Sequence, residues 1–157
     1  MKLLIIRGTV DAGKTTTCAL LHNELVTNCG AEIIHLEVIL GGYYGNVIPI
    51  PDDGNAVDFY SVLKVKNTVV SIISPGDDAQ VLKEDMNNYI SKYHPEIMIV
   101  CARARDVKGS SIRMIKEYFP SLYNLNNEIW TTHSENSSDK IKVKEPVICK
   151  LFEMMQL

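Results

Sequence analysis

Long apolar stretches, strong net charge and paired cysteines are all missing from this sequence. No apolar run approaches the roughly 20 residues of a membrane-spanning helix, so we expect no membrane insertion. The formal net charge is only −3, which argues against general nucleic-acid binding through a broad basic surface. None of the four cysteines belongs to a C-x-x-C pair. Free, mostly buried thiols in a reducing cytoplasm are therefore expected.

The rest of the composition is that of an ordinary globular protein. Hydrophobic residues make up 46% and charged residues 22% of the chain, which disfavours disorder. A chain of 157 residues predicts a single domain, residues 1–157, with a sizeable core. An apolar strand pattern begins at residue 2, leaving no room for a targeting segment before it and supporting a cytoplasmic location.

The most informative stretch runs from Gly8 to Thr16 and reads GTVDAGKTT. It has the form G-x-x-x-x-G-K-[ST], follows an apolar run and opens a helical pattern. The two glycines allow backbone N–H groups to converge closely on phosphate oxygens. The N-terminus of the following helix favours an anion. This stretch, called the glycine loop below, therefore predicts a nucleotide-binding site.

Each residue of the glycine loop is a candidate ligand of a nucleoside triphosphate, ATP or GTP. The predicted nucleotide-binding residues are Gly8, Thr9, Val10, Asp11, Ala12, Gly13, Lys14, Thr15 and Thr16. In this pattern Lys14 reaches the β- and γ-phosphates, and the Thr15 hydroxyl is the predicted ligand of Mg²⁺.

Strands and helices alternate along the chain. Strands are predicted at residues 2–7, 32–39, 57–65, 68–74, 97–102 and 127–132, and helices at 14–29, 78–93, 110–119 and from Pro146. Only Lys66 and Asn67 separate the third strand from the fourth, which indicates a hairpin. We predict an α/β fold with three layers and a doubly wound, mostly parallel sheet, in which 57–65 is an antiparallel edge strand.

Ligands of such folds bind at the carboxyl ends of the strands. This edge should gather the glycine loop, the loop after residue 39, Ser74–Asp77, Arg103–Asp106 and Thr132–Glu135. The loop 41–58 is punctuated by glycine, proline, asparagine and aspartate and is long for a plain connection. We predict that it serves as a switch, a lid, an acceptor site or a contact for a protein partner; the alternative is a surface loop without a role.

The glycine loop resembles the P-loop of the translation-factor GTPases, which usually reads G-H-V-D-H-G-K-T-T. The stretch Ile73–Asp77, ISPGD, is similar to the end of the hairpin that leads into their D-T-P-G-H. The resemblance implies a P-loop NTPase fold, Mg²⁺-dependent nucleotide binding and a switch that responds to the γ-phosphate.

The chain also departs from that pattern. Ile73 stands where the family has a strand-end aspartate near Mg²⁺, Asp77 stands in place of a histidine, and residues 41–57 contain no threonine. The guanine-reading N-K-x-D is missing, with Thr132–Glu135 as its nearest stand-in, so the choice between ATP and GTP stays open. The run Thr15–Thr17 resembles G-K-T-T-T of the signal-recognition GTPases and the ParA/MinD-like ATPases, which leaves the branch open too.

The catalytic candidates are Lys14, Asp77, Arg103 and Arg105. The carboxylates that are candidates to support Mg²⁺ are Asp11, Glu37, Asp58 and Asp77, and Asp77 is preferred among them. The alternative role of Asp77 is to cap the next helix. Alternation along an extended chain would place both arginines on one side, where they would contact a transferring phosphoryl group. Surface pairing with Asp106 or with other acidic residues is their alternative role.

The remaining candidates are weaker. His35 is expected to be structural, His133 is a candidate contact to the base, and Trp130 is expected in the core. Three functions follow for the chain. It is a purine nucleoside triphosphatase or nucleotide switch; a small-molecule or nucleotide kinase that uses the 41–58 loop for its acceptor; or a non-catalytic nucleotide-binding module, which the missing strand-end aspartate favours.

Overall fold

The computed structural model describes residues 1–9, 13–39, 45–51, 56–131 and 144–157. In chain order the elements are β1 (Lys2–Gly8), α1 (Lys14–Asn28), β2 (Glu32–Val38), β3 (Phe59–Val65), β4 (Thr68–Ile73), α2 (Ala79–Tyr93), β5 (Ile97–Arg103), α3 (Ser111–Tyr118), the 3₁₀ turn η1 (Leu125–Asn127), β6 (Glu128–Trp130) and α5 (Glu145–Met155). None of the described helices combines the length and apolarity needed to cross a membrane.

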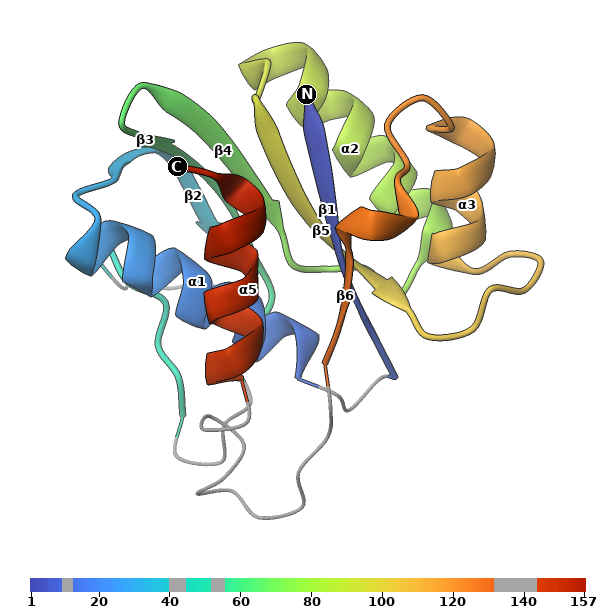
Figure 1. The fold of residues 1–157 in the computed structure, drawn as a ribbon, viewed down its shortest axis with the longest axis horizontal. Coiled ribbons are helices and arrows are strands. Elements are labelled where there is room, and N and C mark those ends of the chain that lie inside the picture. Colours follow the sequence, from blue (N-terminus) through green and yellow to red (C-terminus); the bar gives the residue numbers. More distant parts are fainter. Residues whose placement is uncertain (10–12, 40–44, 52–55, 132–143) are drawn as a thin grey trace.

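Six strands form one mixed sheet in the order β2-β3-β4-β5-β1-β6 (Figure 1). Parallel pairing joins β4 to β5, β5 to β1 and β1 to β6, whereas β3 pairs antiparallel with both β2 and β4. The α/β, mostly parallel sheet with antiparallel pairing at one edge is thus confirmed. The reversed strand is β3, as predicted, but β2 lies outside it and forms the edge.

The hairpin is confirmed between β3 and β4, where Val65 pairs with Thr68. Lys66 and Asn67 connect the two strands, and both have positive φ angles, 49° and 69°. Two residues with positive φ make a turn whose twist matches that of the strands that flank it. This tight turn sets the register of β3 against β4, and the position of one carboxylate in the candidate site depends on that register.

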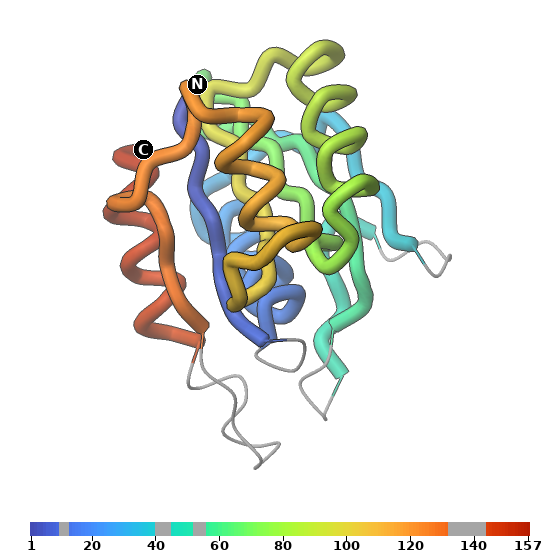
Figure 2. Tube along the Cα trace, turned by 90° about the vertical axis from the view of Figure 1, so that its right-hand side faces the viewer, coloured from blue at the N-terminus to red at the C-terminus, as the bar shows by residue number. Residues whose placement is uncertain are grey.

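Helices cover both faces of the sheet (Figures 1 and 2). On one face α1 and α5 pack on alternate strand residues such as Leu4 and Ile6. On the other face α2 and α3 pack on Leu3 and Ile5. The β1 side chains point alternately to the two layers, so a strand with two buried faces needs the continuous apolar run seen in the sequence.

Trp130 was expected in the core, and that prediction is wrong. The Trp130 residue is 51% exposed because β6 is a short strand at the sheet edge. Its ring lies over the guanidinium of Arg7, 4.5 Å from the ring centroid. The only tryptophan of the chain therefore lies at the surface next to the strand that leads into the glycine loop.

One buried histidine joins α1 to two other segments. His22 is fully buried, with Nε2 2.9 Å from the Asn46 carbonyl oxygen and Nδ1 3.0 Å from the Ser61 hydroxyl. Because a carbonyl oxygen only accepts, Nε2 carries the proton and Nδ1 of the neutral ring accepts from Ser61. Burial lowers the pKa of His22, so the folded chain holds it neutral.

We predict that acid destabilises the fold partly through His22. The unfolded chain takes up a proton on His22 below pH about 6.5, whereas the folded chain resists this proton because the His22 pKa is lowered. The unfolded state therefore binds more protons. The free energy of unfolding should fall as the pH is lowered, by at most about 1.4 kcal/mol per pH unit from this group. Urea unfolding between pH 7 and 5 should show a smaller pH slope for His22→Gln than for wild type. Equal slopes would contradict the prediction, and His94→Asn, at an exposed histidine, is the control.

Candidate nucleotide and metal site

The glycine loop joins β1 to α1 at the carboxyl edge of the sheet. Gly8 ends β1, and Gly13 occupies the N-cap position of α1 with φ 77°. Gly13 has no side chain with which to cap this helix, and none of the described side chains caps it, so its first N–H groups face the loop. The predicted nucleotide-binding residues Val10, Asp11 and Ala12 lie outside the described residues. What is described therefore has the strand, the two glycines and the open helix N-terminus that an anion site needs.

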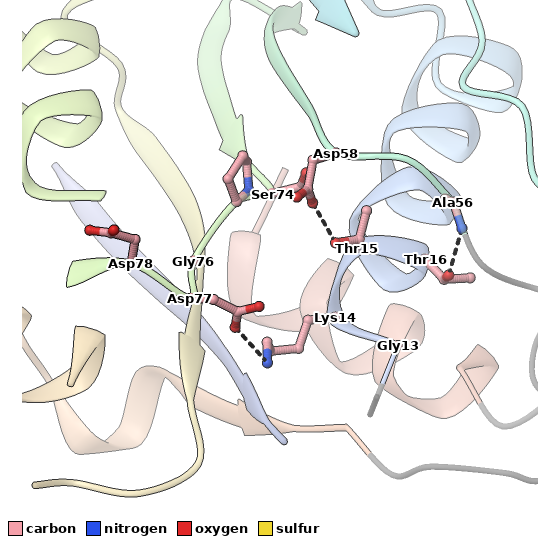
Figure 3. Close-up of a pocket in the computed structure, with 11 residues that line it drawn as sticks. Gly13, Lys14, Thr15, Thr16, Ala56, Asp58, Ser74, Gly76, Asp77 and Asp78 are labelled. Carbon is pink, nitrogen blue, oxygen red and sulfur yellow. Dashed lines mark hydrogen bonds and ion pairs between the residues drawn. The ribbon is translucent and has the colours of Figure 1, made fainter. Parts of the chain in front are cut away.

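Lys14 folds back over the loop. Its side chain is only 6% exposed, and its Nζ donates to the carbonyl oxygens of Gly8 at 2.8 Å and Thr9 at 2.9 Å. The same ammonium lies 3.5 Å from Asp77 Oδ1. Lys14 is thus held at the mouth of a cavity of about 310 Å³ that also touches Thr15, Thr16 and Asp58 (Figure 3).

Asp58 is the carboxylate that meets Thr15. The Thr15 hydroxyl donates to Asp58 Oδ1 at 2.7 Å, and the Ser74 hydroxyl donates to the same oxygen at 3.0 Å. Ser74 is itself held by the backbone N–H of Phe59 at 2.8 Å. Hydroxyl and carboxylate oxygens are the hard ligands that Mg²⁺ prefers. This group of oxygens beside Lys14 therefore fits a magnesium ion.

Chain reversal explains how Asp58 reaches the site. Since β3 runs against the parallel strands, the residue before it lies at their carboxyl edge. The hairpin register pairs Tyr60 with Ile73, which sets Asp58 beside the end of β4. The sequence favoured Asp77 over Asp58 for this position, but the register that follows from a two-residue turn contained the signal for Asp58.

Asp77 lies beside the glycine loop, as expected, but reaches it by an indirect route. β5 lies between β1 and β4, so the strand that leads to Asp77 is not next to β1. The chain instead crosses the end of β5 at Gly76, where an added Cβ would lie 1.9 Å from the carbonyl oxygen of Cys101. This close crossing carries Asp77 back to the glycine loop.

Asp77 then links two cations. Its Oδ1 lies 3.5 Å from Lys14 Nζ and 3.1 Å from Arg103 Nε. The alternative role as helix cap belongs to the next residue, since Asp78 accepts from the N–H of Val81 at 3.0 Å. Asp77 is 49% exposed, so a bound anion can displace it from either cation.

The two arginine candidates differ in their surroundings. Arg103 ends β5 and pairs with Asp77, whereas Arg105 lies beyond the strand and is exposed. Both line a cavity of about 280 Å³ together with Thr9, which keeps them near the glycine loop. Asp106, which the alternative role named as a partner, pairs with Arg113 at 2.7 Å and Lys116 at 2.6 Å. The Arg103–Asp77 pair matches the other form of that alternative, pairing with a different acid.

Arg7 positions the segment that carries Arg103. Its guanidinium pairs with Glu128 of β6 at 3.1 Å and donates to the carbonyl oxygens of Arg103 and Ala104. A buried arginine just before the glycine loop thus fixes the end of β5 against β1 and β6. The role of Arg7 could not be predicted from the sequence, because an arginine inside an apolar strand pattern has no recognisable partner until the sheet order is known.

Lys144 is the second residue that sequence reasoning missed. It stands at the N-cap of α5 and is only 2% exposed. Its side chain covers Gly13, where an added Cβ would lie 2.5 Å from Lys144 Cε and 2.8 Å from Nζ. Position 13 therefore favours glycine for its positive φ, and a larger residue there would also displace the flexible end of Lys144.

The other sequence candidates lie away from this cavity or outside the described residues. His35 packs in an aromatic cluster, with ring centroids 5.8 Å from Tyr93 and 6.0 Å from Tyr89, as expected for a structural residue. Glu37 lies on the same edge strand, 3.8 Å from His35. Asp11, His133, the segment Thr132–Glu135 and residues 41–44 and 52–55 of the 41–58 loop lie outside the described residues.

Within the described part of the chain, no three histidine, cysteine, aspartate or glutamate side chains gather as a metal cluster. A cation held here would depend on the Asp58, Thr15 and Ser74 oxygens, completed by water or phosphate. Comparisons of the chain with models of protein families, with curated proteins and with solved structures found no match.

Proposed function

We propose that this protein binds a purine nucleoside triphosphate with Mg²⁺ at the glycine loop and hydrolyses it. One observation carries the proposal: buried Lys14 and the open N-terminus of α1 face the Asp58 carboxylate across a single cavity. A cation with free helix N–H groups suits phosphate oxygens, and the carboxylate with its two hydroxyls suits Mg²⁺. The groups that suit phosphate and the groups that suit Mg²⁺ lie side by side, as a nucleotide bound together with its metal ion requires.

The magnesium half of the site rests on Thr15, Ser74 and Asp58. Thr15 and Asp58 would hold the ion, with Ser74 orienting the carboxylate through the bond at 3.0 Å. When bound, Mg²⁺ neutralises phosphate charge and orients the triphosphate. Asp58 thereby supplies the carboxylate that is missing at Ile73, which weakens the case for a module without catalysis.

Hydrolysis is assigned to the other side of the cavity. Asp77 is half-exposed next to Lys14 and is placed to accept a hydrogen bond from an attacking water. Arg103, held 3.1 Å from Asp77, is placed to stabilise charge that develops on the transferred phosphoryl group. Arg105 adds a second positive charge near Thr9.

A kinase is the second candidate because another cavity adjoins the first. This second cavity has a volume of about 470 Å³, lies between α2 and α3 and is bordered by Lys83 and Arg113. It shares Asp77 and Asp78 with the cavity that Lys14 lines. An acceptor seated there would lie next to the predicted γ-phosphate position. Asp77 would then accept the proton of the acceptor hydroxyl rather than that of water.

Binding of ATP, GTP, CTP and UTP, with Mg²⁺ or with EDTA, tests the proposal. Trp130 fluorescence and thermal stability should both respond to a purine triphosphate, more strongly with Mg²⁺. Phosphate release without an acceptor supports hydrolysis, and turnover only with an acceptor supports the kinase. Binding without either reaction leaves a nucleotide-binding module, and no response to any triphosphate overturns the proposal.

We predict that Lys14→Met weakens triphosphate binding roughly 20-fold, because a charge-assisted contact to phosphate is lost while the apolar stem remains. The measurement is the Kd from Trp130 fluorescence, with circular dichroism to confirm the fold. Lys64→Met is the control, since Lys64 is an exposed lysine of β3. Unchanged affinity in a folded Lys14→Met variant would place the phosphates elsewhere.

A further inference from the structure

A buried arginine comes directly before the glycine loop. Arg7 is the last residue but one of β1 and is only 7% exposed. Its guanidinium pairs with Glu128 of β6 at 3.1 Å, and the ring centroid of Trp130 lies 4.5 Å from it. Glu128 also accepts from the Tyr123 hydroxyl at 2.8 Å. A planar guanidinium held by a carboxylate and a ring has a fixed orientation, so the direction of its other donors is fixed as well.

These other donors reach the main chain at the end of β5. Nε of Arg7 donates to the carbonyl oxygen of Arg103 at 3.4 Å, and Nη2 donates to that of Ala104. The N–H of Arg103 in turn donates to the Ser111 hydroxyl at 2.9 Å. In the register of β1 and β5, Gly8 lies opposite Arg103. Both polar groups of the Arg103 main chain are therefore bound, level with the start of the glycine loop.

The side chain of Arg103 is much freer than its main chain. It is 40% exposed, and its Nε lies 3.1 Å from Oδ1 of Asp77, which is 49% exposed. A guanidinium on a fixed main chain can exchange this exposed carboxylate for a phosphate oxygen, because only its side-chain torsions need to change. The place that the guanidinium reaches then depends on where the main chain is held.

We propose that Arg7 is a positioning residue for phosphoryl transfer, which holds the Arg103 main chain so that the Arg103 guanidinium reaches the transferred phosphoryl group. This inference rests on the proposed function and extends it to a residue that acts only through another side chain. A misplacement of about 1 Å in a reacting geometry can cost about 100-fold in rate. Arg7 therefore controls the rate of the chemical step, whereas the glycine loop and Lys14 control binding of the triphosphate.

The test replaces Arg7 by lysine, which keeps a positive charge beside Glu128 but loses the planar fork that spans the two carbonyl oxygens. For the triphosphate that wild type turns over best, kcat at saturating Mg²⁺ should fall about 10-fold to 100-fold, while KM should stay nearly unchanged. Tyr123→Phe is the matched control. It removes a bond to Glu128 but leaves the bonds of Arg7 to residues 103 and 104, so its kcat should equal that of wild type.

A double-mutant cycle shows whether Arg7 acts through Arg103. Arg103→Met should lower kcat by itself, and Arg7→Lys should add little to that loss, because the guanidinium that Arg7 positions is already gone. Equal losses from Arg7→Lys with and without the Arg103 side chain would overturn the inference, since Arg7 would then act by another route. Unchanged kcat in a folded Arg7→Lys variant, with or without a rise in KM, would overturn it too.

The outcomes separate this inference from the proposed function. If wild type neither hydrolyses a triphosphate nor transfers its phosphoryl group, both fail. If wild type is active and the cycle shows no coupling between Arg7 and Arg103, only the inference fails. If Arg7→Lys does not fold, Arg7→Gln combined with Glu128→Gln removes both charges together, so that neither is left buried without its partner. The same cycle with Arg103→Met is then measured on that pair, and a lack of coupling there overturns the inference.

Discussion

Replacing Asp58, a proposed ligand, by asparagine is expected to lower the affinity of the site for Mg²⁺ by about 100-fold or more, since even the loss of an outer partner of a metal site costs about 10-fold to 100-fold. Thr15 and Ser74 both donate to the same oxygen of Asp58, Oδ1. The asparagine carbonyl can accept both bonds, so the local fold is retained and only the charge is lost. The gain in triphosphate affinity that Mg²⁺ produces should therefore nearly disappear, whereas affinity in EDTA should change little.

Titrations of nucleotide at several Mg²⁺ concentrations measure this effect. Asp85→Asn is the matched control because Asp85 also accepts a hydroxyl bond, from Tyr60 at 2.6 Å, but lies outside the cavity. Asp77→Asn provides a contrast: it should keep the Mg²⁺ dependence and, by freeing Lys14 from a carboxylate at 3.5 Å, strengthen triphosphate binding. If Asp77→Asn lost the Mg²⁺ effect and Asp58→Asn kept it, the metal would belong to Asp77.

The second large effect is expected from Gly76→Ala, which should lower the free energy of unfolding by about 3 kcal/mol. The new Cβ would lie 1.9 Å from the carbonyl oxygen and 2.4 Å from the carbonyl carbon of Cys101. β5 is a central strand, paired with β1 on one side and β4 on the other, so its backbone has no room to retreat. The crossing segment must move instead, and Asp77 moves with it.

Urea unfolding measures the loss. Gly109→Ala is the control: it has φ 83° but no atom within 4 Å of an added Cβ, so it carries only the backbone cost of about 1 kcal/mol. Equal losses for the two variants would mean that the crossing at Gly76 is not tight.

Local patterns were sufficient for most of the elements. Continuous apolar runs predicted β1 and β5 because both faces of a central strand are buried. Two residues between apolar strands predicted the hairpin at Lys66–Asn67, and Asp78 and Ser110 cap the helices that follow them. These features depend on residues close in sequence, and local sterics and hydrogen bonding decide them.

The site required more than local patterns. Asp58 is 43 residues from Thr15, and only the register of the hairpin that follows Asp58 links it to the loop. Its role depends on the reversal of β3 and on the hairpin register. Arg7 could likewise be understood only once β5 and β6 lay on either side of β1.

The sequence by itself determined the glycine loop, because the turn, the helix N-terminus and Lys14 are contiguous and their geometry follows from backbone conformation. Tertiary structure alone decided which charges meet that loop. It inserted β5 between β1 and β4, passed Gly76 over Cys101 to bring in Asp77, and set Lys144 on Gly13. The physical reason is that these neighbours depend on strand order and close packing between distant segments, which no local periodicity encodes.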